Sequence, residues 1–153
     1  MGNVIQIFTS DTRGKPMQSV QSIEAVTAKG LKGDRNFRDS SDPKRDTPDQ
    51  EVTLIESEAI EAAKRDYSLQ LEAIETRRNI LTRGAALNHL VGREFKVGAV
   101  RLRGVELCEP CSHLEGMTRK GVMRALLHRG GLRAEVLEGG TIRIGDTIQA
   151  SDS

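Results

Sequence analysis

The sequence predicts a mostly β protein with a few short helices, folded as a closed or curled antiparallel β-barrel. Branched apolar residues occur in many short runs, and glycine-containing turns separate these runs. Few segments show helical spacing of apolar residues. Many short strands with few helices are typical of barrels and curled sheets. The length of 153 residues, without a linker-like interruption, fits one domain over residues 1–153.

The first half of the chain is expected to contain strands over residues 4–9, 20–26, 52–55 and 78–82. A helix that Ser57 caps is expected after the third of these strands, because the apolar residues from Ala59 to Tyr67 recur at helical spacing. Residues 38–50 lack aliphatic and aromatic side chains and are expected to form a mobile loop near the site entrance.

The second half is expected to be β from Phe95 onward, interrupted by one helix. That helix is predicted over residues 117–128, with Met123, Leu126 and Leu127 inward. Two strands, near 132–136 and from Ile142 onward, are then expected to meet across a hairpin turn. The predicted turn is Glu138-Gly139-Gly140.

Composition excludes several classes of function. Aromatic residues make up 3% of the chain and tryptophan is absent, which argues against a base-stacking platform for nucleic acid. The net charge of +1 gives no global attraction to nucleic acid or acidic membranes. The first residues lack a signal-peptide pattern, and no apolar run reaches the length of a membrane span. We therefore expect a cytoplasmic protein with reduced thiols.

Both cysteines lie in the run Leu107-Cys108-Glu109-Pro110-Cys111-Ser112-His113, directly after a predicted strand. A thioredoxin-like redox pair would require a βαβ context, whereas the flanking strands are expected to be antiparallel. A zinc site would combine Cys108, Cys111, His113 and His128, but this spacing fits no common structural site. Cys108 is expected to be a buried residue at a strand end. Cys111 follows Pro110 and precedes polar residues, and a nearby cation favours the reactive thiolate.

Two further segments carry candidate anion-binding groups. Arg77 and Arg78 alternate in direction at a strand start, so one faces solvent while the other can face a pocket and bind carboxylate or phosphate. The alternative is a surface charge pair. Asn79 is expected to satisfy a loop backbone or a ligand. The Lys32-Gly33-Asp34-Arg35 turn either caps its own backbone or cradles an anion.

Together these pieces resemble the molybdenum cofactor sulfurase C-terminal domain, the MOSC domain. The matching segments stand in this order: Gly30-Leu31-Lys32-Gly33-Asp34-Arg35, Val52-Thr53-Leu54-Ile55-Glu56, Arg77-Arg78-Asn79-Ile80-Leu81-Thr82-Arg83-Gly84, Leu90-Val91-Gly92-Arg93-Glu94-Phe95-Lys96-Val97-Gly98, Glu109-Pro110-Cys111, and Gly130-Gly131-Leu132 through Gly145-Asp146. Each segment is a weak signal alone, and their order over most of the chain makes the match specific.

The resemblance implies a barrel like the small barrel domain of pyruvate kinase. It implies that Cys111 carries sulfur or ligates molybdenum, and that Arg35, Arg78 and Asn79 lie near a molybdenum–pterin cofactor. Lys32, Gly33, Asp34 and His113 complete the expected cofactor-binding set. Related enzymes reduce N-hydroxylated bases and amidoximes. Larger relatives carry an additional barrel module or a pyridoxal-phosphate desulfurase domain. Residues 1–153 contain neither, so pyridoxal phosphate is not expected here.

Three functions stay open at this point. The chain is a molybdenum-dependent oxidoreductase, a sulfur-transfer protein, or a non-catalytic module that holds a cofactor or partner. The expected partners are a cysteine desulfurase or a redox protein, with neither nucleic acid nor membrane. The oligomeric state is not predicted.

Overall fold

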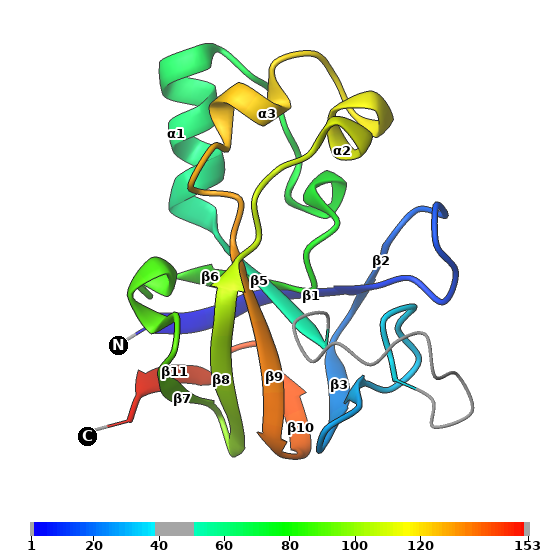
Figure 1. Ribbon diagram of the computed structural model, residues 1–153, viewed down its shortest axis with the longest axis vertical. Helices are drawn as coiled ribbons and strands as arrows, with labels where there is room; N and C mark the ends of the chain where they lie inside the picture. The colour runs from blue at the N-terminus through cyan, green and yellow to red at the C-terminus, as the bar shows by residue number, and fades with distance from the viewer. Residues whose placement is uncertain (1, 39–50, 152–153) are drawn as a thin grey trace.

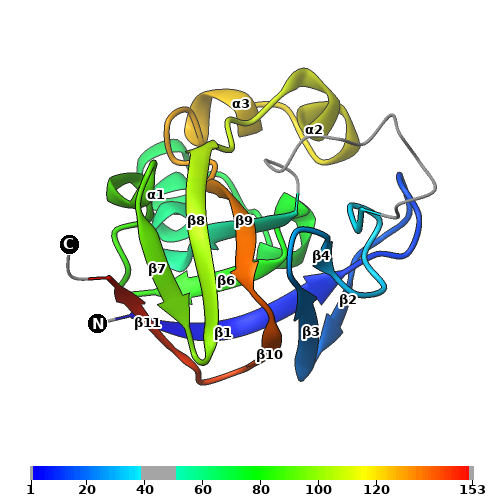
Figure 2. The ribbon, with the colours of Figure 1, turned by 60° about the horizontal axis from the view of Figure 1, so that its bottom comes forward.

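The computed structural model describes residues 2–38 and 51–151. Within these residues, seven strands close a barrel in the order β11-β7-β8-β9-β5-β6-β1, and pairing of β11 with β1 completes the ring. Figure 2 shows this closure, with the first and last strands side by side. The barrel strands are β1 (Gly2–Thr9), β5 (Val52–Glu56), β6 (Ile80–Arg83), β7 (Glu94–Val97), β8 (Val100–Leu107), β9 (Leu132–Glu138) and β11 (Thr147–Ala150).

The predicted mostly β barrel is confirmed, with one difference in strand direction. The β5–β6 pair is parallel, whereas the other named strand pairs are antiparallel. The helix α1 (Ser57–Tyr67) provides the crossover that a parallel pair requires. The helix predicted after β5 is therefore the element that allows β6 to run parallel to β5.

Four short strands lie outside the ring. They are β2 (Gln18–Val20), β3 (Ser22–Val26), β4 (Gly30–Leu31) and β10 (Gly140–Arg143). The single strand expected over 20–26 is wrong, because the chain turns at Gln21: β2 pairs with β1, whereas β3 pairs with β10. The expected 138–140 hairpin is also wrong, since β10 leaves β9 and pairs with β3. Gly139 permits this path, because a Cβ there would lie 2.5 Å from the Ala25 carbonyl oxygen.

The interior of the barrel is an apolar cluster of inward-facing residues. Its fully buried members include Ile7, Leu54, Ile80, Phe95, Leu102 and Leu132. The alternating burial along β8 and β9 reflects the period of two that places every second side chain inside.

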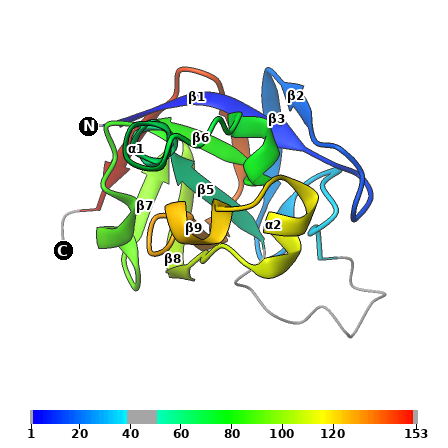
Figure 3. The same ribbon diagram turned by 90° about the horizontal axis from the view of Figure 1, so that it is seen from above.

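The helices cover one end of the barrel, as Figures 1 and 3 show. They are α1, α2 (Ser112–Met117), α3 (Val122–Ala125), and the 3-10 helices η2 (Ala73–Thr76) and η3 (Leu87–Leu90). A second cluster, which includes Leu69, Leu114, Val122 and Leu126, holds α1, α2 and α3 together. None of the helices in the described part of the chain is long and apolar enough to cross a membrane.

The single helix expected over residues 117–128 is wrong. α2 ends at Met117, residues 118–121 are not helical, and α3 begins after Gly121, which adopts a left-handed conformation with φ of 101°. Leu126 is buried as expected, whereas Met123 and Leu127 are 40% and 55% exposed.

The loop predicted over residues 38–50 lies, apart from Arg38, outside the described residues. The two described residues on either side of residues 39–50 contact each other: Arg38 donates a 2.8 Å hydrogen bond to the buried carboxylate of Glu51. Glu51 also accepts a 2.8 Å bond from the Val136 amide of β9. This contact fixes the start of β5 against β9.

Candidate functional site

A pocket of about 280 Å³ lies where the barrel meets α2. Residues from widely separated segments line it: Arg13, Gly14, Arg35, Asn36, Thr53, Arg77, Arg78, Cys108, Cys111, His113, Leu114 and Arg133. The structure thus brings together four of the predicted site residues, namely Arg35, Arg78, Cys111 and His113. Of the other predicted residues, Lys32, Gly33, Asp34 and Asn79 lie outside this lining.

The pocket is strongly cationic. Five arginines contribute to it, and no acidic side chain of the described residues lines it. Arg13, Arg77 and Arg133 were not predicted as site residues. The planar guanidinium group suits bidentate recognition of phosphate and carboxylate. The arrangement favours an anionic ligand group.

Arg78 is buried, and its guanidinium is held by three backbone carbonyls. Nε donates to the Gly130 oxygen at 2.7 Å, Nη1 to the Thr76 oxygen at 3.1 Å, and Nη2 to the Cys108 oxygen at 3.0 Å. Burial lowers the pKa of Arg78, and the neighbouring Cys108 thiol acts in the opposite direction. The guanidinium stays protonated, because its unperturbed pKa is far above neutral. The described residues thus provide acceptors for three of its five N–H groups.

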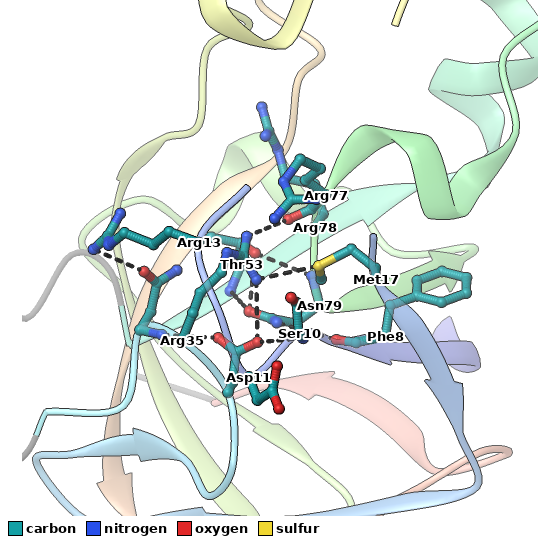
Figure 4. A network of polar contacts seen from close by, with 12 residues as sticks. Phe8, Ser10, Asp11, Arg13, Met17, Arg35, Thr53, Arg77, Arg78 and Asn79 are labelled. Atoms are coloured by element: carbon teal, nitrogen blue, oxygen red, sulfur yellow. Dashed lines mark hydrogen bonds and ion pairs between the residues drawn. The ribbon is translucent and has the colours of Figure 1, made fainter. Parts of the chain in front are cut away.

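Asp34 and Arg35 form a second polar unit, and Figure 4 shows the Arg35 side chain. The Asp34 carboxylate accepts hydrogen bonds from the backbone amides of Ser10 and Asn36, both at 3.2 Å, and from Arg35 Nη1 at 3.1 Å. Arg35 Nη2 donates to the Arg77 carbonyl at 3.0 Å. Asp34 therefore orients the turn and the Arg35 side chain.

The remaining predicted residues of this turn point elsewhere. The Lys32 side chain is 70% exposed and lies 3.8 Å from the Glu24 carboxylate. Gly33 has a φ of 87°, and a Cβ there would meet open space. Its contribution is the left-handed conformation that the turn requires.

Asn79 lies fully buried behind the pocket wall. Its Oδ1 accepts bonds from the Thr53 amide and hydroxyl at 3.1 and 3.0 Å, and its Nδ2 donates to the Phe8 carbonyl at 3.1 Å. Figure 4 shows Asn79 between Thr53 and Phe8. The residue thus joins β1, β5 and the start of β6, and it holds Thr53 in the lining. Contact between Asn79 and a cofactor stays a prediction.

The two thiols differ as predicted: Cys108 is buried and Cys111 is exposed. Cys111 is the residue immediately before α2, in extended conformation. Because β8 and β9 on either side are antiparallel, the βαβ context of a thioredoxin-like pair is absent. Gly130 packs against this segment, since a Cβ there would lie 2.4 Å from the Cys108 oxygen and 2.9 Å from Pro110 Cδ.

A zinc site is not formed. Among residues 2–38 and 51–151, no three His, Cys, Asp or Glu side chains gather as metal ligands. His128 instead contacts Glu109, with 2.7 Å between Nδ1 and Oε2. Contact between Cys111 and a metal stays a prediction.

Comparison with known proteins identifies the family. The MOSC domain matches residues 36–149. The chain belongs to the MOSC domain family. This family is linked to the molybdenum cofactor and to sulfurase-like proteins. A search of the curated proteins found no match.

Solved structures of low sequence identity share the fold of this MOSC domain. YuaD from Bacillus subtilis superposes with a TM-score of 0.82 at 14% identity, covering 100% of this chain and 98% of that one. YiiM from Geobacillus stearothermophilus gives 0.71 at 15% identity, covering 99% and 76%. YiiM from Escherichia coli gives 0.70 at 17% identity, covering 100% and 71%. These likenesses support the barrel architecture.

Proposed function

We propose that this MOSC domain binds the anionic end of a molybdenum–pterin cofactor in the arginine-lined pocket and acts through the Cys111 thiolate. One observation carries the proposal: an exposed thiol opens onto a pocket lined by five arginines. The pterin cofactor carries a phosphate, and guanidinium groups suit this group. The link between the MOSC family and the molybdenum cofactor supports the assignment.

The pocket fits part of the cofactor. Its volume of about 280 Å³ lies close to the lower end of the range of about 300–1,000 Å³ typical of small-molecule sites. We assign it to the phosphate-bearing end, which leaves the remainder of the cofactor near the exposed Cys111. When bound, the cofactor supplies the redox chemistry of molybdenum.

The protein residues have separate roles in this proposal. Arg13, Arg35 and Arg133 neutralise the phosphate at the pocket lining. Arg78 holds the carbonyls of Cys108 and Gly130, and so positions the segment that carries Cys111. His113, two residues further along the lining, donates or accepts one hydrogen bond.

Cys111 serves one of two reactions. As a metal ligand, its thiolate helps set the electronic properties of an oxidoreductase site, and the substrates are N-hydroxylated compounds with electrons from a redox protein. As a sulfur carrier, its thiolate attacks the outer sulfur of a cysteine desulfurase persulfide. The sulfur–sulfur bond of the donor breaks, a persulfide forms on Cys111, and the desulfurase thiolate leaves.

Elemental analysis of protein purified from a host that makes the molybdenum cofactor separates these reactions. Molybdenum near one atom per chain supports the ligand role. Labile sulfur on Cys111 without molybdenum supports the carrier role. A chain that holds neither refutes both and points to a non-catalytic binding module.

A further inference from the structure

A second pocket of about 280 Å³ adjoins the cationic one. Its lining consists of Gly14, Pro16, Met17, Ile74, Glu75, Arg77, Met117 and Thr118. Gly14 and Arg77 belong to both pockets. The two cavities are therefore neighbours that share one wall, beside the loop between β1 and β2.

The second pocket is chemically different from the first, because four apolar side chains dominate its lining. Met17 and Met117 place two thioethers there, and sulfur makes favourable contacts with aromatic rings. The charge of Glu75 is engaged by Arg119, whose Nη2 lies 2.8 Å from Oε2. The Thr118 hydroxyl donates to the Leu114 carbonyl at 2.7 Å. The polar groups of the lining are thus largely satisfied within the protein.

Arg77 is fixed in the shared wall from two sides. Its Nη1 donates to the Lys15 carbonyl at 2.7 Å, and its own carbonyl accepts Arg35 Nη2 at 3.0 Å. Its backbone adopts a left-handed conformation with φ of 62°, which is uncommon for a residue other than glycine. This conformation ends the 3-10 helix η2, of which Arg77 is the C-cap.

Met17 provides a second link between the pockets. Its side chain is buried, and its sulfur accepts a 3.2 Å contact from Arg35 Nη1. Figure 4 shows Met17 and Arg35 joined in this way. A ligand that displaces the Met17 thioether therefore also perturbs Arg35, which lines the cationic pocket.

We infer that the apolar pocket binds the ring of a small, uncharged aromatic molecule, whose polar substituent passes Arg77 toward the Cys111 pocket. This inference rests on the proposed function for the direction of the substituent, since it treats the Cys111 pocket as the reactive site. A cationic ligand is disfavoured, because the adjoining pocket holds five guanidinium groups. A cationic ring also lacks a carboxylate partner in this lining, because the charge of Glu75 is engaged by Arg119.

Benzamide and acetamide form a matched pair of probes, since they share the uncharged amide and differ in the ring. The readout is the NMR signal of ¹³C-labelled methionine methyl groups in the full chain. We expect benzamide to shift the Met17 and Met117 signals at millimolar concentration and to leave Met123, on α3 outside the lining, unchanged. We expect acetamide to shift neither lining signal.

Substitution of Met117, which is 40% exposed, tests the location without disturbing the core. Met117→Glu should weaken benzamide binding at least about tenfold, because it replaces an apolar wall with a carboxylate that a bound ring would have to desolvate. Met117→Leu preserves the apolar volume and should stay within about twofold of the parent.

Equal effects of the two substitutions, equal shifts from the two probes, or no benzamide shift would overturn the inference. If probe binding fails while Cys111-dependent molybdenum loading persists, this inference fails alone. If benzamide binds while Cys111-dependent molybdenum loading is absent, the proposed function fails and the assignment of the apolar pocket stands.

Discussion

The Arg78 guanidinium donates a 3.0 Å hydrogen bond to the carbonyl of Cys108, three residues before the exposed thiol. The same guanidinium reaches the Gly130 carbonyl at 2.7 Å. One buried cation thus joins the chain before β6 to the end of β8 and the approach to β9. This contact fixes the backbone three residues before Cys111.

Arg78→Ala should therefore reduce stability as well as cofactor retention. The substitution leaves buried carbonyls without their donor, and each such group costs about 1–3 kcal/mol. We expect the free energy of unfolding to fall by at least about 2 kcal/mol in denaturant titrations. An unchanged free energy of unfolding would mean that the three carbonyl contacts of Arg78 add nothing to stability.

Arg13→Ala should weaken anion binding while the fold stays intact, because Arg13 is an exposed loop residue in the pocket lining. A charge-assisted contact contributes about 1.5–3 kcal/mol, so we expect roughly tenfold weaker binding of inorganic phosphate by calorimetry. Lys32→Ala is the matched control, since the Lys32 side chain lies outside the lining. Equal losses from the two variants would place the anion elsewhere.

Glu51→Gln should change how stability depends on pH. Burial raises the pKa of Glu51 above its ordinary value of 4.5, although the Val136 amide and Arg38 oppose the shift. A raised pKa in the folded state means that the contribution of Glu51 to stability is present below pH 4.5 and is lost as pH rises through the folded value. The unfolding free energy of the parent should thus fall relative to that of the variant as pH rises above 4.5. If the unfolding free energy of the parent minus that of the variant stays constant or rises with pH, the burial effect is contradicted.

Gly130→Ala should distort the cysteine segment, because its Cβ would lie 2.4 Å from the Cys108 oxygen. Overpacking of this kind costs about 1–3 kcal/mol, which thermal unfolding measures. Gly116→Ala is the control, because a Cβ at this α2 position meets nothing within 4 Å. A Gly130 variant as stable as the Gly116 variant would show that the segment tolerates displacement.

The sequence predicted the barrel, the β5–α1 order and the contrast between the two cysteines. These features follow from local signals: periodic apolar runs, the helical spacing from Ala59 to Tyr67, and polar residues after Pro110. The predicted Ser57 cap is wrong, because Glu56 is the N-cap of α1 and Ser57 is its first helical residue. The break at Gly121 was missed because residues 117–128 carry a helical apolar pattern that a left-handed glycine overrides. The pairing of β10 with β3 was missed because a glycine turn does not specify which strand follows it.

The candidate site was predicted in part. Arg35, Arg78, Cys111 and His113 converge on one pocket, as the resemblance implied. Arg13, Arg77 and Arg133 were missed, since convergence of three distant segments is a tertiary property with no local pattern. Arg77 had one signal, its place in the Arg77-Arg78-Asn79 run, but strand alternation left open which arginine faces the pocket, and the resemblance pointed to Arg78. Its left-handed backbone at the end of η2 breaks that alternation.

The central claim is that the Cys111 thiolate holds metal or sulfur. The most direct measurement is the molybdenum and labile-sulfur content per chain of Cys111→Ser, Cys108→Ala and the parent, all purified from a host that makes the cofactor. The account predicts that Cys111→Ser loses the load while its fold, measured by circular dichroism, survives. It predicts that Cys108→Ala loads like the parent. A Cys111→Ser variant that loads like the parent, or equal loss from both variants, would contradict it.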